Sequence, residues 1–267
     1  MGEKINKKAQ VSIFIVIAVL VVGIIAIYFL IRSGIITEFS AGGKPEENPE
    51  SYLKECIQEK VQDTIKTIMI QGGYMNRDLN IKFQFEGEEY QNISYLCYTS
   101  LDYISCTNQE AMLFTHIKQE IKNEIEDEME ECVNSYFESL KDRGFEVSGV
   151  YNGFSIDSIP EKVILSLDAK VTLTKGGETT NQKDLKIVIP TRIYELTEVV
   201  QEITSQEARF CYFENGGYMM LYPEFKIERY KTSRDVKIYT VIDKRSEEVF
   251  RFAVRSCRIP PGQGTTQ

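Results

Sequence analysis

The chain begins with a long, uninterrupted run of hydrophobic residues. From Val11 to Ile31 the sequence contains no charged residue and no proline. A helix rises about 1.5 Å per residue, so this run would span about 30 Å, the thickness of the hydrocarbon core of a bilayer. A secretory signal peptide has a shorter apolar region that ends at a small-x-small cleavage site, and Ala26-Ile27-Tyr28 is no such site. The pattern therefore predicts a transmembrane helix over residues 10–32, in contact with membrane lipid through Val11–Ile31.

The basic residues around this run predict its orientation. Lys4, Lys7 and Lys8 precede the run, whereas Arg32 is the one basic residue that follows it before the acidic segment. Because basic residues collect on the cytoplasmic side of a membrane span, residues 1–9 should lie in the cytoplasm. The expected location is thus the cytoplasmic membrane, crossed once, with the N-terminus inside and the rest of the chain outside the cell.

Helical periodicity appears again after a short irregular segment. Residues 33–48 contain Gly-Gly and a proline and show no sustained period, which is typical of a linker. Beyond them, apolar residues recur at steps of three and four in three segments, which predict helices. The first starts at Pro49 with Asn48 as its cap and ends at Gly72-Gly73. The second covers about residues 108–143, and the third about 191–210.

Alternating patterns between and after these helices predict strands. The clearest are residues 162–174 and 184–190, in which every second residue is apolar. An odd loop, Gly176-Gly177-Glu178, would pair Ala169 with Leu185 and place both apolar sets on one face. Further strands are expected near residues 81–86, 90–98, 225–230, 236–242 and 249–255.

Together these elements predict an α+β fold: an N-terminal transmembrane helix followed by a disulfide-stapled ectodomain of about three helices with antiparallel β-hairpins. The ectodomain would cover residues 49–258, and the echo of Gly72-Gly73-Tyr74 by Gly216-Gly217-Tyr218 suggests a division into subdomains 49–144 and 145–258. Residues 259–267 should form a flexible tail.

Six cysteines follow the hydrophobic run, an even number that indicates disulfides if this part lies in an oxidising compartment. Cys97 and Cys106 flank a loop of hairpin size, and Cys56 and Cys132 lie on the inward faces of two predicted helices. Cys211 and Cys257 would then join the third helix to the last strand. The expected bonds are Cys56–Cys132, Cys97–Cys106 and Cys211–Cys257, although sequence alone allows 15 connectivities and buried free thiols stay an alternative.

Charge and composition speak against several functions. The formal net charge is −9, and the first 32 residues are net basic, so the remainder is strongly acidic. Such a domain is a poor match for nucleic acid, which requires clustered cations. The acidic stretch Glu124–Glu131 could attract a hard cation, but its position around a helical apolar stripe favours a solvated helix face.

Catalytic groups are sparse. His116 is the sole histidine, and its spacing to Glu120 suits a surface pair better than a metal site. Carboxylates such as Asp102, Asp157 and Asp243 could serve a glycosidase, but no pattern singles them out. The sequence therefore predicts a domain that is not an enzyme, with no catalytic residue, no metal and no cofactor.

Aromatic clusters are the remaining candidates for function. Tyr95, Tyr98 and Tyr103 lie around the loop between Cys97 and Cys106, and Tyr218 and Tyr222 lie around the second Gly-Gly pair. Exposed tyrosines provide contact area for a protein or glycan partner at low entropic cost. Packing of strands and junctions is the alternative explanation. Asn92-Ile93-Ser94 is a glycosylation sequon, with Asn92 as the acceptor.

The N-terminus resembles a known class of signal. The stretch Lys7-Lys8-Ala9-Gln10-Val11-Ser12 looks like the class III signal of archaeal type IV pilin-like proteins, in which a basic pair and a small residue precede Gln and the hydrophobic helix. The resemblance implies cleavage between Ala9 and Gln10. Assembling subunits of that family usually have Glu at the fifth mature position, where this sequence has Phe14.

The whole chain also looks like membrane-anchored surface proteins of small-genome archaea, which have cysteine-bearing helices followed by Gly-Gly-Tyr. These resemblances imply a location rather than an activity. The function we expect is that of a single-pass cell-surface protein with a non-catalytic ectodomain for binding, adhesion or envelope structure. The alternatives are a minor pilin-like subunit of a surface filament and a membrane-anchored hydrolase.

Overall fold

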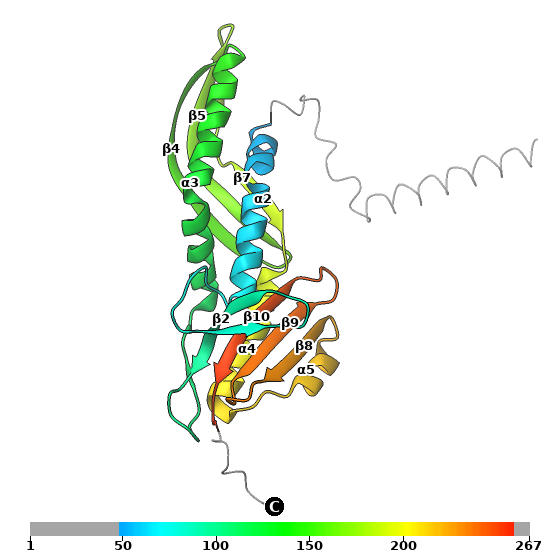
Figure 1. The fold of residues 1–267 in the computed structure, drawn as a ribbon. Helices are drawn as coiled ribbons and strands as arrows, with labels where there is room; N and C mark the ends of the chain where they lie inside the picture. The colour runs from blue at the N-terminus through cyan, green and yellow to red at the C-terminus, as the bar shows by residue number, and fades with distance from the viewer. Residues whose placement is uncertain (1–47, 259–267) are drawn as a thin grey trace, which may run out of the picture. The chain divides into compact units, whose positions relative to one another are not determined.

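The computed structural model describes residues 48–258. The predicted cytoplasmic segment 1–9, the predicted span 10–32, the linker as far as residue 47 and the tail 259–267 lie outside the described residues. So do Ala9 and Gln10, the residues of the expected processing site. The description that follows concerns residues 48–258 alone (Figure 1).

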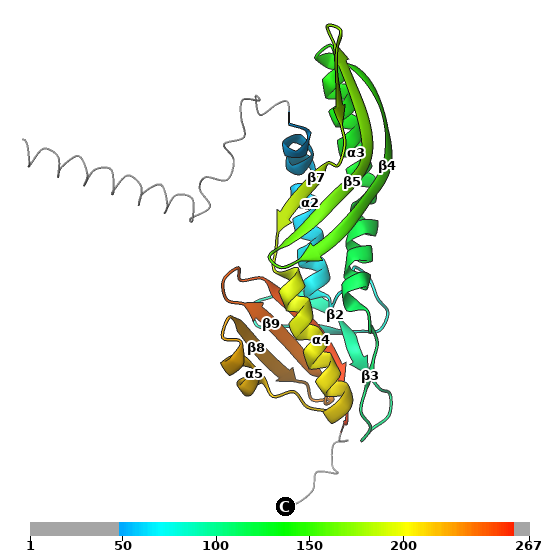
Figure 2. The ribbon, with the colours of Figure 1, turned by 180° about the vertical axis from the view of Figure 1, so that it is seen from behind.

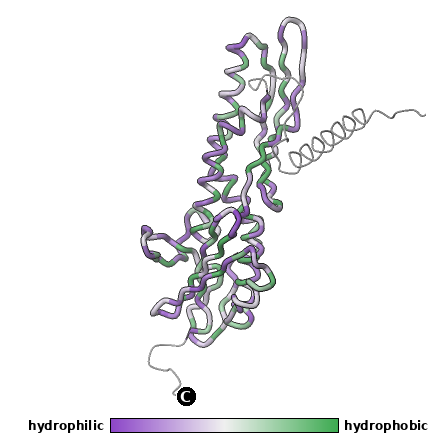
Figure 3. The backbone as a smooth tube through the Cα atoms, turned by 90° about the vertical axis from the view of Figure 1, so that its right-hand side faces the viewer, coloured by the Kyte–Doolittle hydropathy of each residue, from purple (hydrophilic) through white to green (hydrophobic). Residues whose placement is uncertain are grey.

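Four helices cover the described part of the chain: α2 (Pro49–Ile70), α3 (Leu113–Asp142), α4 (Ile193–Phe210) and α5 (Asn215–Leu221). At the start of α2 the Asn48 side chain accepts a hydrogen bond of 3.0 Å from the amide of Glu50, as expected for an N-cap before proline. At the end of α4 Cys211 takes the left-handed conformation, with φ of 57°. Figure 3 shows hydrophobic and hydrophilic residues in turn along the long helices, the pattern of helices with one buried face.

The larger sheet has the strand order β1-β2-β10-β9-β8, with the short β3 paired to β2. Its neighbours are antiparallel except for β2 and β10, which run parallel. The strands are β1 (Asn80–Gln84), β2 (Tyr90–Tyr98), β3 (Thr107–Asn108), β8 (Phe225–Lys231), β9 (Lys237–Asp243) and β10 (Val249–Arg255).

The smaller sheet is antiparallel throughout. Its long central strand β5 pairs with β4 on one side and with β6 and β7 on the other. The strands are β4 (Glu146–Ile159), β5 (Lys162–Lys175), β6 (Glu178–Gln182) and β7 (Lys186–Pro190).

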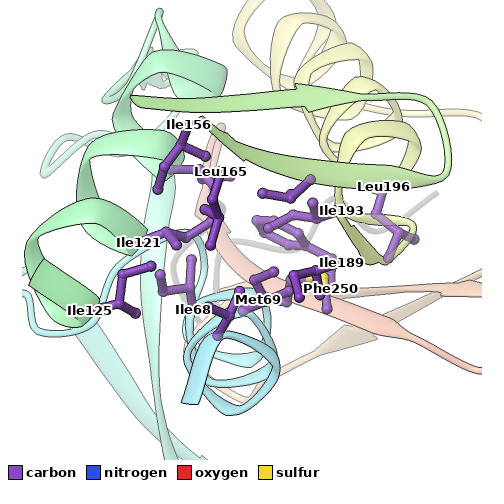
Figure 4. Packing of buried hydrophobic residues seen from close by; sticks show 14 of the residues in the cluster. Ile68, Met69, Ile121, Ile125, Ile156, Leu165, Ile189, Ile193, Leu196 and Phe250 are labelled. Carbon is purple, nitrogen blue, oxygen red and sulfur yellow. The ribbon is translucent and has the colours of Figure 1, made fainter. Parts of the chain in front are cut away.

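One continuous hydrophobic core joins the helices to both sheets. Helix α4 lies across the face of β9 and β10 (Figure 2), while α2 and α3 pack against each other beside the smaller sheet. Ile68 from α2, Ile121 from α3, Leu165 from β5 and Phe250 from β10 converge in the centre of this core (Figure 4). A separate small cluster on the opposite face of the larger sheet includes Ile93 and Ile238.

The predicted fold class requires correction. Residues 48–258 are α+β, but they contain four helices, not about three, and ten strands in two sheets rather than separate hairpins. The parallel contact of β2 with β10 was not predicted because it depends on residues that are far apart in sequence, such as Tyr95 and Ala253. None of the helices in this part of the chain is long and apolar enough to cross a membrane. The described fold therefore has no transmembrane helix, and the predicted one falls outside it.

The register of the β5–β6 hairpin also differs from the prediction. Gly176 and Gly177 form a two-residue loop with positive φ values, so Lys175 pairs with Glu178 and Leu173 with Thr180. The irregularity that realigns the apolar residues occurs later, between β6 and β7, where Asp184 has φ of 59°. As a result Leu165 faces Ile187, and the expected pair of Ala169 and Leu185 does not form.

Two further elements differ from the prediction for tertiary reasons. Helix α3 starts at Leu113 rather than near Asn108, because Thr107 and Asn108 pair with β2 as strand β3. The strand β4 was not predicted, since Gly149 and Gly153 interrupt its alternation, but pairing along β5 orders it.

The presence of disulfide bonds, predicted from the even number of cysteines, is confirmed. The structure joins Cys56 to Cys132, Cys97 to Cys106 and Cys211 to Cys257. The first bond links α2 to α3, the second closes the loop between β2 and β3, and the third links the end of α4 to the residues after β10. All six cysteines are therefore paired.

Candidate functional site

A cleft of about 450 Å³ lies in the described part of the chain. It lies between the C-terminal half of α2, the start of β2, the end of β7 and the turn between β9 and β10. A volume of this order is typical of pockets that hold a small molecule or one or two side chains of a partner.

The floor of the cleft is apolar. Ile65, Met69 and Ile70 come from α2, where helical spacing places them on neighbouring faces, and Pro190 and Val249 come from β7 and β10. Ile65 and Met69 are also part of the main core, each with 2% of its surface exposed. The floor is therefore anchored in the packed interior.

One wall of the cleft is built on Arg251, whose buried Nε has no hydrogen-bond partner among the described residues. Its guanidinium donates two hydrogen bonds to the carboxylate of Glu88, at 2.6 and 2.7 Å, and one to the Gln91 side chain at 2.8 Å. The same guanidinium lies 4.0 Å from the centre of the Phe85 ring. The hydrogen bonds from Arg251 hold the pKa of Glu88 below its usual value. The ion pair between Arg251 and Glu88 therefore holds both side chains of this wall in position.

The opposite wall is built on Glu248. Its carboxylate accepts hydrogen bonds from the Thr191 hydroxyl at 2.7 Å, from the Arg192 amide at 2.5 Å and from the Ser246 hydroxyl at 3.1 Å. These contacts tie the β9–β10 turn to the start of α4. The Glu248 carboxylate is thus engaged on both oxygens by neighbouring residues.

A buried ion pair supports this turn from behind. The side chain of Asp243 is fully buried and accepts a hydrogen bond of 3.0 Å from Nε of Arg192. It also accepts from the amides of Arg245 and Ser246, at 2.8 and 3.0 Å. Burial raises the pKa of Asp243, but these amides and the Arg192 guanidinium lower it by more, so the net pKa lies below its usual value. The turn that closes the cleft is thus held by an ionised carboxylate.

The rim of the cleft carries exposed charges of both signs. Lys66 on α2 and Glu247 in the β9–β10 turn are both exposed lining residues. A ligand in the cleft would therefore contact an apolar floor, two engaged polar walls, and one cation and one anion near the opening.

The five predicted tyrosines lie outside this cleft, in two groups. Tyr95 is buried in the small cluster and packs edge to face with Tyr98 at 5.1 Å, whereas Tyr103 is 56% exposed in the loop before Cys106. Tyr218 and Tyr222 pack together at 4.7 Å in and after α5. Tyr95 therefore has a packing role, and the structure does not bring the two groups into one surface with the cleft. Asn92 is exposed on β2.

The residues considered for catalysis also lie apart from one another. The ring of His116 packs at a tilt against that of Tyr74, with centroids 4.1 Å apart, and its nitrogens lie 3.7 Å from Glu120 and 3.8 Å from Glu110. Asp102 pairs with Arg255, and Asp157 is exposed on β4. Among the described residues no group of three or more His, Cys, Asp or Glu side chains could hold a metal ion.

No pattern in the sequence predicted the cleft. Its walls pair Glu88 with Arg251 and Thr191 with Glu248, residues that are far apart in the chain and belong to no recognisable motif. One local signal was available: Ile65 and Met69 are among the regularly spaced apolar residues that predicted the first helix. Comparisons with protein-family models, with curated protein sequences and with solved structures found no significant match.

Proposed function

We propose that this chain is a cell-surface protein whose residues 48–258 form a non-catalytic binding domain, and that the cleft beside α2 receives an apolar side chain of a protein partner. The observation that carries this proposal is the contrast between the apolar floor of the cleft and its internally engaged polar walls.

The energetics of the cleft favour an apolar guest. The carboxylates of Glu88 and Glu248 and the two terminal nitrogens of Arg251 already take part in short hydrogen bonds with neighbours, so a polar ligand would have to compete with those bonds. An apolar group gains the full benefit of leaving water, about 25 cal/mol for each Å² that it buries against the floor. Lys66 and Glu247 at the rim suit a flanking polypeptide with charges of both signs.

Two features support a location outside the cytoplasm. Disulfides form and persist in oxidising compartments, and all six cysteines of the chain are paired. The charge bias around residues 11–31 favours export of the residues that follow. The pilin-like resemblance of the N-terminus agrees with a surface protein, while Phe14 in place of Glu favours a binding role over a filament subunit.

Selection from a displayed random peptide library, with the full-length protein as bait, tests this function. We expect enriched peptides to share an apolar residue, and their affinity to fall at least about tenfold in Val249→Arg, because a buried charge at the floor costs more than 1.4 kcal/mol. Val188→Arg is the matched control, since Val188 is a partly exposed residue of β7 outside the cleft lining. Equal binding by the Val249→Arg protein and the native protein would refute the assignment.

A further inference from the structure

A second cavity, of about 260 Å³, lies where α4 ends above β8 and β9. Its lining includes three basic side chains, Arg229, Lys231 and Lys237, and the acidic Asp235. The disulfide between Cys211 and Cys257 lies at its border. In a chain with a net charge of −9, a cavity with this excess of cations stands out.

Strand geometry explains why the cations gather here. Successive side chains of a strand point to opposite faces, so Arg229 and Lys231 share a face of β8 with the buried Phe225 and Ile227. The residues of this face are therefore apolar in the first half of β8, which contacts α5, and basic in its second half. Lys231 is also directly opposite Lys237 of β9, a pairing of like charges that is unfavourable unless other groups offset it.

Internal acids offset only part of this charge. The Lys237 ammonium donates to both carboxylate oxygens of Glu207, at 2.7 and 2.8 Å, and to the carbonyl of Cys211. Lys231 forms an ion pair with Asp235. Glu207 and Asp235 thus pair with two of the three lining cations, whereas the third, Arg229, lies near the solvent-exposed carboxylate of Glu214.

Arg229 is held directly by neutral groups, and it also interacts electrostatically with the exposed carboxylate of Glu214, which accepts a hydrogen bond of 2.6 Å from the Tyr212 hydroxyl. Its guanidinium donates a hydrogen bond of 3.2 Å to the carbonyl of Phe213 and lies 5.0 Å from the centre of the Tyr212 ring. These contacts fix the plane of a group whose fork of N–H donors matches an oxyanion.

The electrostatics of Lys237 agree with this picture. Burial lowers the pKa of its ammonium, the Glu207 carboxylate opposes that effect, and the positive charges of Arg229 and Lys231 lower the pKa further. The net pKa lies below the usual value for lysine. An anion in the cavity would relieve the repulsion among the three cations.

We propose that this cavity binds an oxyanion group, such as phosphate, sulfate or their monoesters, between Arg229 and Lys231, with Lys237 behind them. An oxyanion is small enough for the cavity, and the side chains of Arg229 and Lys231 line the space that it would occupy. Its source is either the free ion or an ester carried by a larger molecule, and the two share the same recognition chemistry.

Thermal unfolding of the full-length protein tests the proposal, with inorganic phosphate titrated against chloride at constant ionic strength. We expect a saturable rise in Tm with phosphate, because a ligand that binds the folded state stabilises it. The apparent Kd should rise at least about tenfold in Arg229→Gln and in Lys231→Gln, each of which removes one charge-assisted contact. Methyl phosphate in a parallel titration separates the sources: a matching rise shows a cavity open to esters, and a rise with the free ion alone shows a closed one.

Lys226→Gln is the matched control. Lys226 lies on β8 but on the opposite face, where it pairs with Glu228. Its replacement removes the same formal charge from the same strand, so its phosphate response should equal that of the native protein. The Tm of each variant in chloride reports any loss of folding separately. The proposal fails if phosphate gives no saturable rise beyond chloride, or if Lys226→Gln weakens the response as much as Lys231→Gln does.

Discussion

Glu207 shows how a single buried residue depends on its partners. Its side chain is fully buried on α4, where the carboxylate accepts hydrogen bonds from Lys237 and, at 2.5 Å, from the hydroxyl of Tyr239. Ser256 donates to the Glu207 carbonyl as well, at 3.1 Å. A charge this far from water is tolerable only while its counter-ion is present.

Replacement of Lys237 by Met should therefore destabilise the fold by about 3–5 kcal/mol, since it leaves the Glu207 carboxylate buried without its cation. Urea unfolding at neutral pH measures this loss. The double variant Glu207→Leu with Lys237→Met should recover most of it, because it removes both charges. A single variant within 1 kcal/mol of the native protein would contradict this account.

The lowered pKa of Asp243 leads to a prediction of how the free energy of unfolding changes at acid pH. Its pKa is lower in the folded protein than in the unfolded chain, so the folded state favours the ionised form. Its contribution is therefore complete above the unfolded pKa of about 3.9 and is lost as the pH falls through the folded pKa. We expect Asp243→Asn to be less stable at pH 7 and to lose less stability below about pH 4 than the native protein. Urea midpoints across this range, with the exposed Asp157→Asn as control, measure the difference.

At the scale of elements, the turn after α2 decides how that helix meets the larger sheet. Gly72 has φ of 81°, and a Cβ atom added there would lie 3.0 Å from the carbonyl oxygen of Ser94 on β2. Gly216 and Gly217, which echo this pair in sequence, lie instead inside α5. The same Gly-Gly sequence thus allows a close backbone approach after α2, whereas near the C-terminal strands it forms part of a short helix.

Gly72→Ala should destabilise the fold more than Gly177→Ala does. Both glycines have positive φ, so both variants incur about 1–2 kcal/mol of backbone strain. Only at Gly72 does the new methyl group meet the backbone of a neighbouring strand, whereas at Gly177 nothing lies within 4 Å. We expect an additional loss of about 1–3 kcal/mol for Gly72→Ala in chemical unfolding. Equal losses in the two variants would show that the contact with Ser94 relaxes freely.

At the scale of the whole molecule, the chemistry of the N-terminus bears on where the protein works. The likeness of Lys7-Lys8-Ala9-Gln10 to a pilin-type signal leads us to expect cleavage before Gln10. Mass spectrometry of the mature native protein should then find a chain that begins at Gln10, and substitution of Lys7 and Lys8 by Gln should leave the precursor uncut. A native chain that begins at Met1 or Gly2 would show that this likeness has no processing role.

Local patterns predicted elements more successfully than contacts. The apolar periodicity of α2 and α4 and the alternation of β5 placed these elements within a few residues, because burial of one face is written directly in the spacing. The short α5 escaped prediction, since no residue of it is buried and its glycines indicate a turn. The candidate tyrosines were proposed for their exposure, but Tyr95 faces inward, a distinction that depends on which face of β2 the neighbouring elements cover.

By itself the sequence determined most of the helical and strand segments, the acidic character of the residues after the hydrophobic run and the even number of cysteines, because these follow from residue type and spacing. Only the tertiary structure decided the parallel contact of β2 with β10, the break that realigns β7 against β5, and both cavities. The cleft requires Glu88 to meet Arg251, and the basic cavity requires Lys231 to face Lys237 beyond the end of α4. These long-range contacts depend on strand register and on the connections between strands, and no short-range pattern of residues encodes either one.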